Sequence, residues 1–115
     1  MITKNDLKKY LATGATLDKN GESINFFSGY QVGGVAEVFK INEKSLNKIL
    51  QAVKKLLKKC PASAFVGIWV NGGVVYVEYS EHVAKLSEAM KKGIERGEIS
   101  IFDWMFKREI VTAEK

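Results

Sequence analysis

The strongest hydrophobic pattern in the chain lies in residues 64–80, where two apolar runs flank Asn71-Gly72-Gly73. β-Branched and aromatic residues dominate both runs, and Asn-Gly or Gly-Gly between such runs predicts a β-hairpin with a two-residue turn. Either turn produces the same two faces. One is aliphatic (Val66, Ile68, Val70, Val75 and Val77), and the other carries Phe65, Trp69, Val74, Tyr76 and Glu78. Because both faces are largely apolar, we expect this hairpin to be central in its sheet and covered on both sides.

A helical period of apolar residues precedes the hairpin. Residues 46–60 keep this spacing without a miss, Asn42 is a suitable N-cap, and Pro61 marks the end. The opposite face is rich in lysine. A second long helix is expected over residues 80–96, with Ser80 as its cap and Gly97 as its C-terminal stop. The aliphatic face of the hairpin should lie under the apolar stripes of both helices.

Shorter elements complete the pattern. Residues 5–13 predict a short helix, and residues 15–27 predict a hairpin with Asn20-Gly21 as its turn. Further strands are expected at 35–41, 98–104 and 109–112, with a turn near Lys107-Arg108. The sequence therefore predicts one α+β domain over residues 1–115, with a mostly antiparallel sheet of five to seven strands. Two long helices should pack on one face of that sheet.

Composition narrows the class of protein. Nothing in the sequence has the length and apolarity of a membrane helix or the apolar core of a signal peptide, and the single Cys60 excludes an internal disulfide. We therefore expect a cytoplasmic protein without a membrane partner. The net charge is +5, and residues 43–60 alone carry a formal +5. This concentration permits contact with a nucleic-acid backbone or another polyanion, although lysines on the wet face of a helix also serve solubility.

Two surfaces are therefore candidates for partner binding. The first is the basic helix face, with Lys44, Lys48, Lys55, Lys58 and Lys59; the second is the aromatic face of the hairpin, with Phe65, Trp69 and Tyr76. Lysine without interleaved arginine or aromatic residues gives no readout of bases, and the aromatic residues lack the surrounding motif of an RNA-recognition module. The sequence leaves open which surface is the contact. It also leaves open whether the apolar stretch around Asp103-Trp104 closes the core or forms an exposed patch.

Catalytic and metal-binding residues are sparse. His82 could act as a general base with Glu78 or Glu81, but no second histidine or suitable cysteine completes a site. Cys60 sits on the apolar stripe of its helix, where we expect a core residue. Residues 29–34 resemble a phosphate loop only in their glycines, so a strand bend or a mobile loop is the simpler interpretation. The sequence predicts no cofactor, no metal and no catalytic residue.

A resemblance suggests a broader role. Residues 67–69, 76–80 and 99–104, together with Ala89, look like parts of small uncharacterised proteins of phages and mobile elements. In size and composition the chain is similar to anti-CRISPR inhibitors. The resemblance implies a non-enzymatic protein that binds a protein or nucleoprotein complex and inhibits a nucleic-acid-directed host defence. The first alternative is a self-associating interaction module or homodimer. The lowest-ranked alternative is a small enzyme that uses His82.

Overall fold

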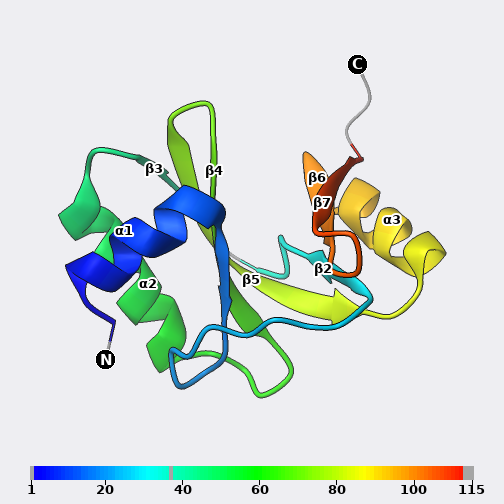
Figure 1. Ribbon diagram of the computed structural model, residues 1–115, viewed down its shortest axis with the longest axis horizontal. Helices are drawn as coiled ribbons and strands as arrows, with labels where there is room; N and C mark the ends of the chain where they lie inside the picture. Colours follow the sequence, from blue (N-terminus) through cyan, green and yellow to red (C-terminus); the bar gives the residue numbers. More distant parts are fainter. Residues whose placement is uncertain (1, 37, 113–115) are drawn as a thin grey trace.

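The computed structural model describes residues 2–36 and 38–112. Helices and strands follow one another in the predicted order of a helix, three strands, a helix, two strands, a helix and two strands (Figure 1). The elements are α1 (Lys4–Thr13), β1 (Ala15–Leu17), β2 (Tyr30–Val32), β3 (Val38–Asn42), α2 (Leu46–Lys58), β4 (Phe65–Asn71), β5 (Val74–Val83), α3 (Leu86–Glu95), β6 (Ser100–Asp103) and β7 (Arg108–Val111).

The strands form a seven-stranded sheet in the order β1-β4-β5-β2-β6-β7, with β3 also paired to β5. Every pairing between strands is antiparallel, which confirms the predicted α+β class and the predicted number of strands. The first part of β5 pairs with β3 and β4, and its last residues pair with β2. This long strand is therefore the element that both ends of the sheet share (Figure 1).

The β4–β5 hairpin has the register that its sequence predicts. Asn71 pairs with Val74, so Gly72-Gly73 forms the two-residue turn, with φ values of 59° and 80°. Positive φ at both central residues is the requirement of a type I′ turn, which glycine meets without steric cost. Trp69 pairs with Tyr76, and Ile68 with Val77, so the aromatic and aliphatic side chains separate onto opposite faces as expected.

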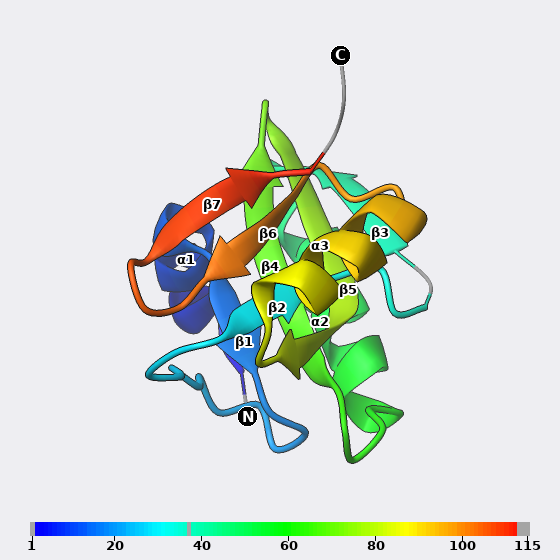
Figure 2. The ribbon, with the colours of Figure 1, turned by 90° about the vertical axis from the view of Figure 1, so that its right-hand side faces the viewer.

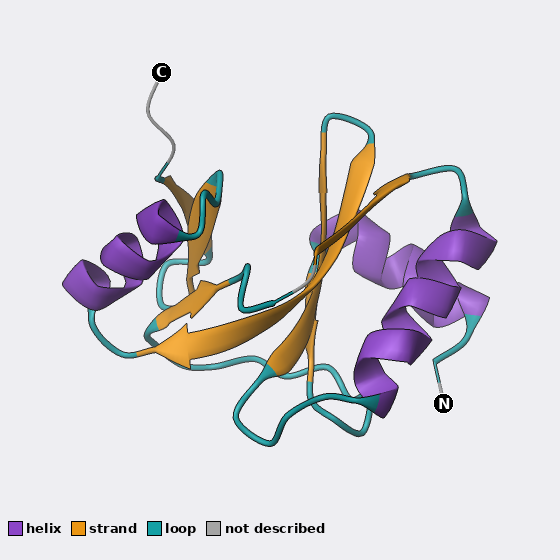
Figure 3. Cartoon of the chain, turned by 180° about the vertical axis from the view of Figure 1, so that it is seen from behind, coloured by secondary structure: helices purple, strands orange, loops and turns teal. Residues whose placement is uncertain are grey.

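The helices are shorter than predicted, and α2 and α3 pack at different ends of the sheet. α2 has 13 residues and α3 has 10, and they lie at opposite ends of the strands (Figure 3). α1 and α2 pack against each other and against the β4–β5 hairpin, whereas α3 packs against β2, β6 and β5. The prediction of two long helices over the aliphatic face of the hairpin is therefore wrong: α2 and α1 cover that face.

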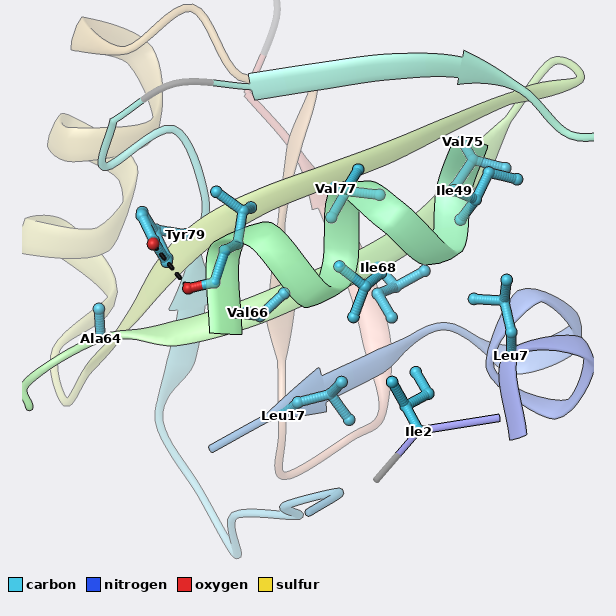
Figure 4. Packing of buried hydrophobic residues seen from close by; sticks show 13 residues of the cluster. Ile2, Leu7, Leu17, Ile49, Ala64, Val66, Ile68, Val75, Val77 and Tyr79 are labelled. Carbon is cyan, nitrogen blue, oxygen red and sulfur yellow. Dashed lines mark hydrogen bonds between the residues drawn. The ribbon is translucent and has the colours of Figure 1, made fainter. Parts of the chain in front are cut away.

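The buried apolar side chains form two clusters. The larger lies between the hairpin, α1, α2 and β1, where Ile49, Val66, Ile68, Val75 and Val77 interlock (Figure 4). The Tyr79 hydroxyl donates a hydrogen bond to the Leu56 carbonyl at 2.7 Å and so ties β5 to α2. The smaller cluster comprises Val32, Val83, Ala89 and Ile101 and lies under α3. Figure 2, which views the molecule from the α3 end, shows α3 and the β6–β7 hairpin in front of the central strands.

The starts of two helices differ from the sequence prediction. Residues 80–83 extend β5 instead of beginning a helix, because they pair with β4 and β2. α3 begins only at Leu86, without a side-chain cap. Asn42 ends β3 and does not cap α2: its Oδ1 accepts a hydrogen bond from the Lys44 amide at 2.8 Å, and Ser45 precedes the helix. Pairing within the sheet has overridden local capping preferences at both places.

The predicted hairpin over residues 15–27 is only partly formed. β1 pairs with β4, and the return chain keeps an isolated bridge between Leu17 and Ser23. The Asp18 carboxylate accepts hydrogen bonds from the Asn20 and Glu22 amides at 2.9 and 3.0 Å, so a local side-chain turn replaces the regular hairpin.

The last hairpin, β6–β7, is present as predicted, with its turn at residues 104–107. Lys107 adopts a φ of 53°, a conformation that glycine adopts more readily, so the residue at this position gave no sequence signal for the turn.

Among the described residues, no helix combines the length and the apolar character that spanning a membrane requires.

Candidate binding site

A groove of about 780 Å³ runs between the two ends of the sheet. The C-terminal end of α1, β1 and β4 line one side, and β6 with the β6–β7 turn lines the other. Aromatic and acidic side chains meet along it, including Trp69, Glu78, Glu98 and Trp104. The groove therefore brings the aromatic face of the hairpin together with residues from the C-terminal third of the chain.

One row of side chains crosses three adjacent strands beside this groove. Lys40 of β3 pairs with Tyr76 of β5, which pairs with Trp69 of β4. The Tyr76 and Trp69 rings stack with their centroids 4.4 Å apart, and the Lys40 ammonium lies 5.9 Å from the Tyr76 ring centroid. Both contacts are of kinds that stabilise pairs across a sheet. The predicted candidates Trp69 and Tyr76 are both half-buried and form one ordered stack.

Glu78 lies in the next row, and it is buried with only 2% of its surface exposed. Its cross-strand partner in β4 is Gly67, which leaves space for the carboxylate. The Trp69 indole Nε1–H donates to Glu78 Oε2 at 2.6 Å, and the Gly34 amide donates to Oε1 at 2.7 Å. Both oxygens of a buried carboxylate are thus satisfied, as a buried charge requires.

Glu98 follows α3 and reaches the same carboxylate from the other end of the sheet. Its side chain is hydrogen-bonded to Glu78. Burial of Glu98, the negative charge of Glu78 and this hydrogen bond together raise the pKa of Glu98 to about 7. Arg96 and Lys40 oppose the rise through their positive charges. A protonated Glu98 accounts for the contact, because two ionised carboxylates would repel each other.

Gly33 and Gly34 form a cradle for this pair. A Cβ atom at Gly33 would lie 2.5 Å from Glu78 Oε1 and 2.6 Å from Glu98 Oε1, closer than side chains tolerate. Arg96 Nη1 donates to the Gly33 carbonyl at 3.2 Å and holds the segment from the other side. The sequence suggested a strand bend or a mobile loop here, and the glycines in fact follow β2 and admit the two carboxyl groups.

A buried polar chain continues from Ser80 along the floor of the groove. Gln31 donates through Nε2 to Ser80 Oγ at 2.9 Å, and its Oε1 accepts from the Trp104 indole at 3.0 Å. Trp104 therefore closes the core, which answers part of the question about the 102–106 stretch. Met105 and Phe106 are exposed instead, and their amides donate to the buried Asp103 carboxylate.

Phe65, the third aromatic candidate, belongs to a separate ring cluster. Phe26 meets Phe65 edge-on with centroids 5.4 Å apart and stacks on His82 at 3.9 Å. The chain between β1 and β2 thus covers this end of the aromatic face. Phe65 is half-buried and is not among the residues that line the groove.

The two carboxylates predicted to work with His82 do not lie beside its imidazole. It lies in β5 and not in a helix, and its Nε2 is 2.7 Å from the Ser28 carbonyl oxygen. Glu78 stands four residues away along the same strand, about 13 Å by strand geometry. Glu81 is the adjacent residue and points to the opposite face, where it pairs with Lys92 and Arg96.

Cys60 packs beside the larger hydrophobic cluster, as its position on the stripe predicts. Its Sγ lies 3.4 Å from the Ala64 carbonyl oxygen. Burial raises the pKa of this thiol, and the charge of Asp18 adds to the effect. A thiol in this environment is a weak nucleophile.

The second predicted surface is the basic face of α2. Lys48, Lys55 and Lys58 lie on its exposed side, Lys59 is its C-cap residue, and Lys44 lies in the turn before it. In the described part of the chain the salt bridges involve Lys92, Arg96 and Arg108, so acidic side chains leave these five lysines un-neutralised. The Lys55 ammonium also lies 5.4 Å from the Phe39 ring centroid.

The structure thus separates the two predicted surfaces. Trp69 lines the groove and Tyr76 stacks on the Trp69 ring, whereas the lysines cover α2, which packs on the aliphatic face of the hairpin. Sequence reasoning missed Glu98 and the role of Gly33-Gly34. Glu98 carries no local signal, because only the return of the chain after α3 brings it to Glu78.

No three histidine, cysteine, aspartate or glutamate side chains in residues 2–36 and 38–112 are placed to share a metal ion. No protein-family model matches the chain, and comparison with curated proteins and with solved structures found no match either.

Proposed function

We propose that the protein is a non-enzymatic binding protein that contacts a polyanionic surface, such as a nucleic-acid backbone within a nucleoprotein complex, through the basic face of α2. The observation that supports this proposal is the row of exposed lysines without acidic partners in the described structure. From Lys48 to Lys58 the row extends about 15 Å along the helix axis. A row of this length can follow several phosphates.

The energetics of such a contact come from counterion release. The logarithm of the association constant falls linearly with the logarithm of the salt concentration. On duplex DNA, each lysine that neutralises a phosphate makes this slope more negative by about 0.9. Lysine ammonium groups are point charges that give little base discrimination, so we expect binding that depends strongly on salt and weakly on sequence.

The test measures fluorescence anisotropy of labelled duplex and single-stranded oligonucleotides over a range of salt concentrations. Replacing Lys48, Lys58 and Lys59 with glutamine should weaken binding and make the salt slope shallower by about 3, with little change in Tm. Lys55 is left intact because it also contacts Phe39.

The matched control replaces three exposed lysines on other elements, Lys8, Lys85 and Lys91, and removes the same charge. Equal losses of affinity in both triple variants would show that net charge, and not the α2 face, drives binding. No salt-dependent binding by the unmodified protein would refute the proposal.

The broader role that we propose is inhibition of a nucleic-acid-directed host defence complex by a phage or mobile-element protein. The resemblance in the sequence and the basic face support it. Expression in a host that carries an active defence system should restore plaque formation by a targeted phage, and the α2 triple variant should lose that effect. No restoration against any system tested would refute the inhibitor role.

A second candidate is self-association through the open edge of β7. β7 ends the sheet, Val111 is exposed on it, and Met105 and Phe106 are exposed in the preceding turn. An unpaired edge with apolar neighbours favours pairing with a second copy. Light scattering at several concentrations distinguishes the two candidates, because a strict monomer excludes this one.

A further inference from the structure

The contact between Glu78 and Glu98 joins two parts of the fold that have separate hydrophobic clusters. Glu78 lies in the part of β5 that pairs with β3 and β4, next to the larger cluster. Glu98 follows α3, which covers the smaller cluster. Between the two ends lies the groove, which both carboxyl groups line. A change in their contact would therefore alter how the two walls of the groove are held together.

Geometry makes the contact dependent on one proton. Glu78 already accepts from the Trp69 indole and the Gly34 amide, so both of its oxygens act as acceptors. A hydrogen bond from Glu98 to this carboxylate needs a proton on Glu98. Gly33 fills the space beside both groups so closely that a methyl group would not fit. Loss of the proton would place two negative charges in contact, with little room to separate unless Glu98 turns outward.

The neighbouring charges do not remove this repulsion. Arg96 stands at the end of α3, but its guanidinium is shared between the Gly33 carbonyl at 3.2 Å and Glu81 Oε1 at 3.4 Å. Lys40 comes from β3 and lies over the Tyr76 ring. Glu81 is further occupied by a salt bridge to Lys92 of α3, which Glu88 also approaches.

The charged residues elsewhere along the groove are mixed in sign. Lys9 comes from α1, and Lys107 and Glu109 come from the β6–β7 hairpin. Lys9 and Lys107 are positive and Glu109 is negative, so these charges partly offset one another along the groove.

We infer that the Glu78–Glu98 pair is a proton-dependent latch between the two ends of the sheet, which holds the walls of the groove together when Glu98 is protonated and releases them when it ionises. This inference is independent of the lysine face of α2. The transition lies near pH 7, the value to which burial and the charge of Glu78 raise the pKa of Glu98.

The test follows the two N–H groups that donate to Glu78 by ¹⁵N NMR. The Gly34 amide and the Trp69 indole resonances should shift together with a midpoint near pH 7 in the unmodified protein. Glu98→Gln keeps a donor to Glu78 but has no titrating proton, so both shifts should become flat over the same range. A ¹³C label in the glutamate side chains assigns the titration to a carboxyl group.

Two controls separate the latch from other titrations. Glu95→Gln removes an exposed carboxylate at the end of α3 and should leave both transitions unchanged. Imidazoles also titrate in this pH range, so His82→Asn should likewise leave them unchanged. Flat resonances in the unmodified protein, or transitions that persist in Glu98→Gln, would overturn the latch.

Discussion

The hydrogen bond between Trp69 and Glu78 can be tested by removing the indole N–H while keeping an aromatic ring. In Trp69→Phe, the phenyl ring retains the stacking position over Tyr76, but Glu78 Oε2 loses the donor now at 2.6 Å. Glu78 is 2% exposed, so water cannot readily replace that donor. We therefore expect a clear loss in the free energy of unfolding.

The expected magnitude has two parts. A hydrogen bond to a charged group contributes about 1.5–3 kcal/mol. The smaller ring adds a packing loss of about 1 kcal/mol, because Trp69 is only half-buried. Trp69→Phe should therefore lower the free energy of unfolding by about 2.5–4 kcal/mol.

Urea denaturation followed by far-UV circular dichroism measures this difference. A double-mutant cycle with Glu78→Met isolates the hydrogen bond, because methionine fills a similar volume and accepts no strong hydrogen bond. The unpaired Gly34 amide occurs on both sides of that cycle and cancels. We expect a coupling of about 1.5–3 kcal/mol between the two positions. A coupling below about 0.5 kcal/mol would show that the indole contributes only packing.

Two more predictions concern the same pair of carboxyl groups. The pKa of Glu98 is about 7 in the folded protein and 4.5 ordinarily, so the native state binds more protons between these values and its stability falls as pH rises through them. Since Glu98 is partly exposed, solvent screening reduces the effect to about 1–2 kcal/mol. In urea titrations the free energy of unfolding of Glu98→Gln should exceed that of the unmodified protein by this amount at pH 8 and equal it at pH 4. The same pH dependence in both proteins would contradict this prediction. Gly33→Ala places a methyl group against both carboxyl groups and should lower the free energy of unfolding by about 1–3 kcal/mol in the same assay, whereas a neutral result would show that the segment moves freely.

The sequence predicted those parts of the fold that local patterns determine. The β4–β5 hairpin follows from the alternation of its side chains and from Gly72-Gly73, and the apolar stripe of α2 follows from its helical period. Residues 80–83 were predicted as helix because Ser80 resembles a cap, but pairing with β2 supplies more backbone hydrogen bonds than a helix start would. Non-local pairing of this kind leaves no signal in a short window of sequence.

The candidate site was predictable only in part, for the same reason. Trp69 and Tyr76 emerge from the hairpin pattern, and the structure places them together. Glu78 was identifiable as the acidic residue on that aromatic face. Its partner Glu98 lies 20 positions later in the chain and after a helix, so only the three-dimensional course of the chain reveals the pair.

The sharing of β5 by both ends of the sheet has a consequence for cooperativity. The larger cluster is built from residues of α1, α2, β1 and the β4–β5 hairpin. The smaller cluster has only Val32, Val83, Ala89 and Ile101 as its buried members among the described residues. The region around α3 therefore has less buried apolar surface to oppose local unfolding. We therefore expect α3, β2, β6 and β7 to open locally before the β4–β5 hairpin unfolds.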